Sequence, residues 1–224
     1  MPLTVRLVVR LFGDASGDLK ALLQGDEEIY VAAVVAGEIH DCRRCAKRAV
    51  GQADDIPEAR WNDMIDKQKR RLFDKLSDSN LNLGIARVRY HGLTQLDGQH
   101  QLYNAQFDID WDLALEARAY AEIVDRLADE RHARLVFDRV NSPSQSDQVV
   151  SRAEELLNSV DVSFEGSRHE KGIQTADCLA GAAAEDERHN TDWLNQIAED
   201  RIVECGDAVL SNFDISVHTY STDP

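Results

Sequence analysis

The sequence predicts an α/β protein in which helices flank one mixed β-sheet. Apolar side chains recur at every second residue over residues 3–12, which is the period of a β-strand. A second β-rich segment follows at residues 28–39 and is most simply antiparallel to the first. After these two segments, helical and strand patterns alternate, as is typical of a mixed sheet covered by helices.

The remaining elements follow from their spacing. The helical spacing of Trp61, Met64 and Leu72 predicts a helix over residues 54–77, with Pro57 in its first turn. Strands and helices are then expected, in order, over residues 83–93, 110–130, 133–140, 144–158, 160–166 and 172–186, and a further helix over residues 191–205. We therefore expect one domain over residues 1–190, with a C-terminal helix and tail over residues 191–224 packed on it.

The charge of the chain is strongly negative. Its 41 acidic residues against 25 basic ones give a net charge of -16, and the bases comprise 19 Arg but 6 Lys. Acids spread along the whole chain with few lysines favour a protein adapted to high salt, where self-repulsion is screened. The alternative is an ordinary acidic protein that avoids nucleic acid.

The sequence contains no pattern of a secretory or membrane-spanning segment. The longest apolar run, which starts at Tyr30, is far too short to cross a bilayer. Four cysteines are too few for a disulfide scaffold, so we expect a reduced, cytoplasmic protein without a membrane partner. A phosphate-binding glycine-rich loop, a dinucleotide fingerprint and a serine-hydrolase elbow are also missing.

Four carboxylates lie where chemistry is plausible. Asp14 leaves the first strand, Asp138 is near the end of a later strand, Asp177 borders the apolar face of a small-residue helix, and Glu58 opens the helix of Trp61. Acids at such places are costly unless paired or bound to metal, and Mg²⁺ or Mn²⁺ takes carboxylate oxygens. The alternatives are a turn residue at Asp14, an ion pair at Asp138 and a helix-dipole residue at Glu58.

Several motifs resemble those of the domain of unknown function 3800 family. They are "FGDASGD", "EARWNDM", "VFDR" and "GIQTADCLAGAAAED". The last matches the closing helix motif of the family at Gln174, Ala176, Asp177, Ala180 and Gly181. The first matches its opening motif at Asp14, Ser16 and Gly17, with Ala15 where the family usually has Glu.

This resemblance implies a ribonuclease H-like mixed β-sheet flanked by helices, with a C-terminal helical extension. It also implies a pair of Mg²⁺ or Mn²⁺ ions held by Asp14, Asp138 and Asp177, with Glu58 as a fourth ligand. Ser16 would orient a ligand or a substrate phosphate. His169, just before the helix of Asp177, would be a mobile general acid or base, although an ordinary surface histidine is the commoner explanation.

A second constellation is formed by His40, Cys42 and Cys45 in "HDCRRC", which provides half of a zinc site. No second close pair of cysteines follows, so zinc is a lesser alternative, and a redox-active CxxC pair is another.

Two functions follow from these observations. The first is a divalent-metal-dependent nuclease acting on RNA or DNA. The second is a non-catalytic ribonuclease H-like binding module, in a defence or mobile-element context, which Ala15 and the acidity favour. Basic clusters in residues 43–48 and 67–71 would form one basic side for a nucleic acid, or would be ordinary solvated helix faces.

Overall fold

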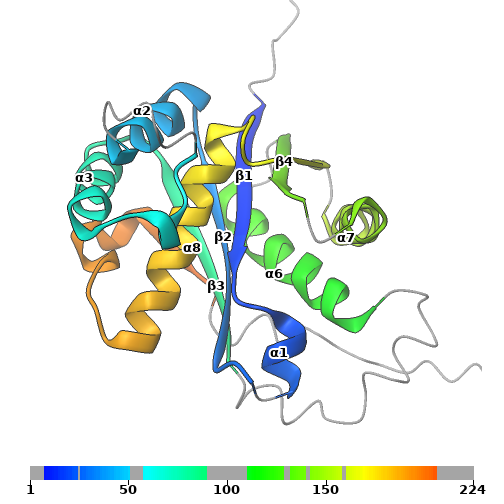
Figure 1. Cartoon of the computed structure of the whole chain (residues 1–224). Coiled ribbons are helices and arrows are strands. Elements are labelled where there is room, and N and C mark those ends of the chain that lie inside the picture. The colour runs from blue at the N-terminus through cyan, green and yellow to red at the C-terminus, as the bar shows by residue number, and fades with distance from the viewer. Residues whose placement is uncertain are drawn as a thin grey trace, which may run out of the picture.

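The structure of the protein is a computed structural model (Figure 1). It describes residues 8–24, 26–50, 58–89, 110–128, 132–139, 142–157 and 160–205. Expectations for residues 3–7, 54–57, 90–93 and 206–224 lie outside these described residues.

A single six-stranded sheet forms the centre of the described part of the chain, with strand order β5-β4-β1-β2-β3-β6. β2 pairs antiparallel with β1 and β3, whereas β4 is parallel to β1, β5 to β4 and β6 to β3. The expected mixed sheet and its early antiparallel pair are therefore confirmed. The strands are β1 Val9–Ser16, β2 Ile29–Ala36, β3 Asn82–Arg89, β4 Ala133–Asp138, β5 Val160–Glu165 and β6 Ile202–Glu204.

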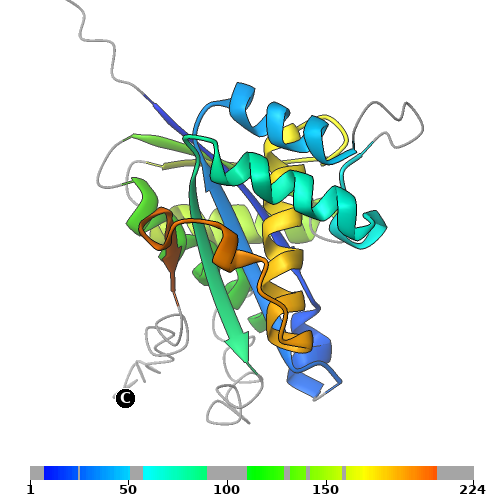
Figure 2. The same cartoon turned by 90° about the vertical axis from the view of Figure 1, so that its left-hand side faces the viewer.

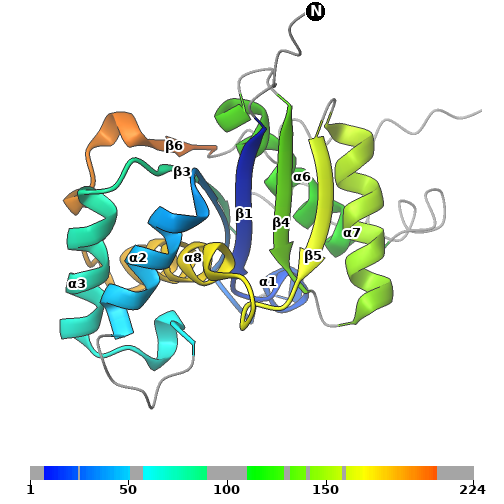
Figure 3. The same ribbon diagram turned by 90° about the horizontal axis from the view of Figure 1, so that it is seen from above.

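Helices cover both faces of the sheet, as Figures 1 and 3 show. On one face, α6 packs on β2 and β3, and α7 packs on α6 and β5. On the other face, α8 lies against β1 and β2, and α2 packs between α8 and α3. The helices are α1 Leu19–Gln24, α2 Ile39–Val50, α3 Asp66–Ser77, α6 Trp111–Ala128, α7 Pro143–Leu156 and α8 Lys171–His189.

Alternation along β1 divides the protein into two apolar cores. Leu11 joins the core under α6 with Tyr120 and Phe137, while its neighbour Phe12 joins the core under α8 with Leu179. Because side chains of a strand point to opposite faces in turn, one strand supports both layers.

Small residues let α8 approach its neighbours closely. A Cβ on Gly172 would come within 2.1 Å of the Phe12 ring, and a Cβ on Gly181 would come within 2.4 Å of the Trp61 ring. The helix is therefore held near β1 at one end and near the short 3-10 helix Trp61–Asp63 further along.

Glu185 of α8 fixes the aromatic residues packed on this layer. Its carboxylate accepts hydrogen bonds from the indole N–H groups of Trp61 and Trp193, both at 2.9 Å, and from Lys69. The Lys69 ammonium also lies 4.2 Å from the Trp61 ring centroid. Burial alone would raise the pKa of Glu185, but these donors outweigh it and lower the pKa below its usual value.

Several expectations about the elements were wrong. Asp14 lies inside β1 rather than at its exit, because the strand continues to Ser16. The helix that contains the expected first-turn Glu58 begins only at Asp66, since residues 58–65 run as an extended segment and one 3-10 turn.

The C-terminal helix expected over residues 191–205 is also wrong. The segment forms two 3-10 turns, Leu194–Gln196 and Glu199–Arg201, and then β6, which pairs with β3 (Figure 2). Trp193 packs on the rings of Trp61 and Phe73 there, so tertiary packing decides its conformation. The division at residue 190 stays a prediction.

No α-helix in the described part of the chain is both long enough and apolar enough to span a membrane.

We predict that Gly181→Ala destabilises the protein by about 1–3 kcal/mol, because the new methyl group overpacks the Trp61 ring. Alanine otherwise favours a helix over glycine by about 1 kcal/mol, so the sign of the effect is informative. Thermal unfolding of purified variants measures it. Gly166→Ala is the control, because no atom lies within 4 Å of its added Cβ. Equal melting temperatures for Gly181→Ala and the wild type would contradict the close approach of α8 to Trp61.

Candidate functional site

The sheet register brings two of the predicted carboxylates together. Gly13 of β1 pairs with Phe137 of the parallel β4, so the next residues, Asp14 and Asp138, follow on neighbouring strands. Adjacent strands lie about 4.8 Å apart, which places these two backbones side by side at the carboxyl edge of the sheet.

Gly17 turns the chain directly after this edge. Its φ of +100° is a conformation that side chains with a Cβ rarely adopt, and an added Cβ would lie 2.8 Å from the Ile29 carbonyl oxygen. The Ser-Gly of the opening motif therefore ends β1 sharply, just beyond Asp14.

All four predicted ligands line one pocket of about 450 Å³. Asp14 and Asp138 come from the sheet, Asp177 from α8, and Glu58 from the segment before the 3-10 helix. The remaining lining residues include Arg60, Asp63 and Ser167.

Each aspartate uses one oxygen in a hydrogen bond that holds it in place. Asp14 Oδ1 accepts from its neighbour Ala15 N–H at 2.7 Å, and Asp177 Oδ2 accepts from the Trp61 N–H at 2.9 Å. Asp138 Oδ1 accepts from the N–H groups of Arg139 and Ser167, at 2.9 and 3.0 Å. The second oxygen of each aspartate accepts no hydrogen bond from the described residues, which leaves three carboxylate oxygens available to a ligand.

Glu58 differs from the three aspartates because cations already surround it. Its Oε2 lies 3.2 Å from an Arg60 nitrogen and 3.8 Å from an Arg168 nitrogen, and the Ser167 hydroxyl donates to its Oε1. Glu58 therefore serves to hold Arg60 at the pocket even without a metal ion.

Crowding of these carboxylates changes their acidity. Burial and the nearby charges of Asp177 and Asp138 raise the pKa of Asp14 well above its usual value. Burial also raises the pKa of Asp177 to about 6, although the Trp61 N–H and Arg60 oppose the shift, and burial raises the pKa of Asp138. The arrangement costs free energy unless protons or a cation offset the negative charge.

A further carboxylate, Glu116 of α6, lies on the other side of Asp14 and was missed in the sequence. It lines a second pocket of about 260 Å³ that Asp14, Ala15 and Asp138 also line. Glu116 is buried, and burial together with Asp112 raises its pKa to about 8. The buried Tyr30 hydroxyl lies beside it without a well-formed hydrogen bond to any described residue. Its signal was present, because Glu116 falls three residues after Leu113 and four before Tyr120, on the apolar stripe of the helix.

Two predicted site residues lie elsewhere. Ser16 is in β1 but lines neither of these pockets. His169 is exposed and lines a separate pocket with Arg10 and Arg134, on the face of β1 and β4 beside α8. The roles predicted for Ser16 and His169 stay predictions.

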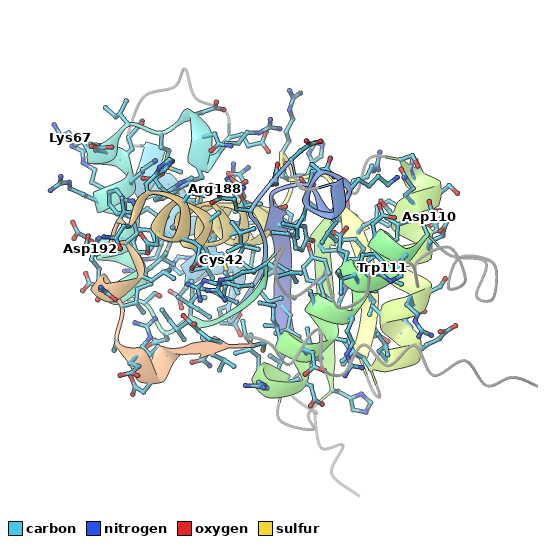
Figure 4. The ribbon with its side chains drawn as sticks, turned by 90° about the horizontal axis from the view of Figure 1, so that it is seen from below. Cys42, Lys67, Asp110, Trp111, Arg188 and Asp192 are labelled. Atoms are coloured by element: carbon cyan, nitrogen blue, oxygen red, sulfur yellow. The ribbon has the colours of Figure 1, made fainter. Side chains whose placement is uncertain are left out.

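The alternative zinc site does not assemble among the described residues. Cys42 and Cys45 are buried in the core under α8, whereas His40 is exposed. Burial raises the pKa of Cys45 to about 11, and all four cysteines are free thiols. Cys42, which Figure 4 labels in this layer, is fully buried.

The donor set around Asp14 fits Mg²⁺ or Mn²⁺ in its chemistry. Hard cations take carboxylate oxygens, and Asp14, Asp138 and Asp177 each present one oxygen without a described hydrogen-bond donor. As they stand, no three His, Cys, Asp or Glu side chains of the described chain are grouped tightly enough to hold a metal ion. Binding would therefore require these side chains to turn toward one another.

Comparison with solved structures identifies the architecture. A chain of the PCNA:RNase HII complex from Archaeoglobus fulgidus superimposes with a TM-score of 0.54 at 14% identity, covering 87% of this chain and 82% of that one. Bst-RNase HIII in complex with Mn²⁺ superimposes with a TM-score of 0.51 at 10% identity, covering 87% of this chain and 57% of the other. The chain has a ribonuclease H-like fold.

No protein-family model matches the sequence, and no curated protein matches it either. The ribonuclease H-like fold predicted from the motifs is thus confirmed by structural likeness. The sequence identity is too low to indicate a shared activity.

We predict opposite effects of aspartate substitution in the absence and presence of metal. Asp14→Asn and Asp177→Asn remove buried, mutually repelling charge, so without metal each raises the melting temperature by about 2–4 °C, or about 1 kcal/mol. Mn²⁺ raises the melting temperature of the wild type, and the two variants lose most of that increase.

The control for this experiment is Asp161→Asn, an exposed aspartate of β5 outside both pockets. It is expected to change neither the melting temperature nor the response to Mn²⁺. A full Mn²⁺ response in Asp14→Asn and Asp177→Asn would contradict a metal centre at this edge of the sheet.

Proposed function

We propose that the protein is a divalent-metal-dependent nuclease that hydrolyses phosphodiester bonds. The observation that carries this proposal is the convergence of Asp14, Asp138 and Asp177, from two strands and a helix, on one pocket of a ribonuclease H-like fold. Similar folds in RNase HII and in the Mn²⁺ complex of RNase HIII support a nucleic acid substrate and a divalent ion.

In this proposal Asp14, Asp138 and Asp177 hold the ions, with Glu58 from one side and Glu116 from the other as further ligands. When bound, Mg²⁺ or Mn²⁺ supplies an activated water and stabilises the charge on the leaving oxygen. Glu116 and Ala15 line the same pocket, so in this proposal a carboxylate from α6 replaces the second acid of the family motif.

Two arginines that lie at Glu58, of which Arg60 lines the pocket, position the substrate. Arg60 and Arg168 are 56% and 78% exposed, and both lie at Glu58. Their guanidinium groups form charge-assisted hydrogen bonds with phosphate oxygens at the mouth of the pocket. Asp177 is held by the Trp61 N–H, so the packing of Trp61 on α8 orients a catalytic carboxylate.

The motifs quoted above support membership of the domain of unknown function 3800 family. The acid-rich, lysine-poor composition supports a salt-adapted source. We therefore include membership of this family, a salt-adapted source and a cytoplasmic location in the proposal.

A non-catalytic binding module on the same fold is the second candidate. It is favoured by Ala15 and by carboxylates that are not grouped for metal binding as they stand. In that case Arg60 and Arg168, which Glu58 holds in place, would bind a phosphate without cleaving it.

We predict that the purified protein with Mn²⁺ cleaves at least one of labelled RNA, DNA and RNA–DNA hybrid. Asp14→Asn, Asp138→Asn and Asp177→Asn are expected to lower the rate at least about 100-fold, because each removes a ligand charge. Glu116→Gln is expected to lower it at least about tenfold. Asp161→Asn is the matched control and keeps the wild-type rate.

Two results would decide against the nuclease. One is the absence of cleavage of all three substrates with Mn²⁺ and with Mg²⁺. The other is cleavage that Asp14→Asn leaves unchanged, because such activity would come from another site or from a contaminating enzyme.

A further inference from the structure

Positive charge is concentrated on two helices of this acidic protein. α2 and α3 together contain nine basic residues and three acidic ones, whereas the other 200 residues contain 16 basic and 38 acidic ones. The two helices thus have a net charge of +6 and the remainder of the chain has -22. Such a separation creates a field that attracts polyanions to one region and repels them from the rest.

Packing places this charge on the surface. α2 buries Cys42, Cys45 and Ala46, and α3 buries Leu72 and Phe73, all in the core under α8. Six of these bases occupy the opposite, exposed sides of the helices, whereas Lys69 is buried against Glu185, and Figure 4 shows Lys67 at the outer edge of this layer. We call the exposed bases the basic face; they are Arg43, Arg44, Lys47, Lys67, Arg70 and Arg71.

The charge of the basic face is hardly neutralised within the described chain. Arg44 lies 3.5 Å from Asp41, and the other five bases form no ion pair with a described residue. The buried apolar sides already account for the packing of α2 and α3, so packing does not require these bases. An external anion is therefore the natural partner of the basic face.

A short segment that includes the 3-10 helix connects the carboxylate pocket to the first residues of α3, which carry part of the basic face. Arg60 lines the pocket, and Lys67 follows it by seven residues, so their Cα atoms are at most about 25 Å apart. One turn of a nucleic acid duplex spans about 34 Å. A backbone whose phosphate lies at Arg60 therefore reaches the basic face within one turn.

The chemistry of the basic face favours phosphates of a nucleic acid over other anions. Four of its six bases are arginines, which bind phosphate oxygens through two parallel N–H groups. Because Arg60 lines the pocket and Lys67 follows it by seven residues, a partner that is charged along its length can contact both the pocket and the basic face.

We propose that the basic face binds the phosphate backbone of a nucleic acid duplex that extends from the carboxylate pocket. The continuation into the pocket rests on the proposed function, whereas binding to the basic face does not. Binding in the absence of divalent ions therefore tests the basic face independently of catalysis. If the protein binds a duplex but never cleaves it, the proposal for the basic face stands and the proposed nuclease activity is wrong.

The test measures binding of the full chain to a fluorescein-labelled RNA–DNA hybrid and to a DNA duplex of about 20 base pairs, by anisotropy with EDTA, at several salt concentrations. Arg70→Gln/Arg71→Gln is compared with Arg10→Gln/Arg134→Gln. Both double variants remove two exposed arginines that have no ion pair with a described residue, and Arg10 and Arg134 are partners across β1 and β4. The change in net charge is thus identical.

We expect Arg70→Gln/Arg71→Gln to weaken binding at least about tenfold at about 0.1 M salt. The logarithm of the association constant falls as the logarithm of the salt concentration rises. In this variant that slope should become less negative by about 2, one unit for each lost phosphate contact. The control pair should weaken binding less than about threefold. Melting temperatures close to that of the wild type show that both variants are folded.

Three results would overturn the proposal. The first is an equal or larger loss in the control pair, because net charge alone would then explain binding. The second is unchanged affinity in Arg70→Gln/Arg71→Gln. The third is tighter binding to vesicles of anionic phospholipid than to either duplex, which would assign the basic face to a membrane surface.

Discussion

Mutual repulsion of carboxylates at the edge of the sheet is the constraint on which this structure depends. Parallel pairing of β1 with β4 places Asp14 beside Asp138, and α8 adds Asp177 to the same pocket. Burial and proximity raise the pKa of Asp14 well above its usual value, so the folded chain retains a cost that packing must offset. Carboxylates whose pKa values are raised in this way are characteristic of functional sites, because a structural role would not require three acids in one place.

Close packing on α8 stabilises the fold and so offsets the unfavourable free energy of bringing these carboxylates together. Gly172 and Gly181 let the rings of Phe12 and Trp61 touch the helix, and Glu185 ties the indoles of Trp61 and Trp193 to it. The same packing presents the Trp61 N–H to Asp177. The closing motif therefore provides both the acid and the small residues that hold a donor against it.

The sequence contained enough to predict five of the six described strands, α6, α7 and α8, because their apolar residues recur with a clear period. It did not reveal α2, although Cys42, Cys45 and Ala46 recur at helical spacing on its buried side, because the two cysteines were interpreted as half of a zinc site. It also predicted a helix around Trp193 and Leu194, where packing on Trp61 and Phe73 selects 3-10 turns instead. Local pattern decides elements that are strongly periodic, and tertiary contacts decide the rest.

The candidate site shows the same division. Asp14, Asp138 and Asp177 could be singled out because acids are unusual within apolar strands and helices. Their convergence depends on strand order, which pattern does not provide. Glu116 was overlooked because a glutamate in a long amphipathic helix looks like a solvated residue, although it lies on the buried stripe with Leu113 and Tyr120.

The measurement that tests the central claim most directly is a crystal structure of the protein grown with Mn²⁺, with diffraction data collected at the manganese absorption edge. The account predicts anomalous density in the pocket, within bonding distance of the carboxylates of Asp14, Asp138 and Asp177. Absence of anomalous density there at saturating Mn²⁺, or density confined to another part of the protein, would contradict it.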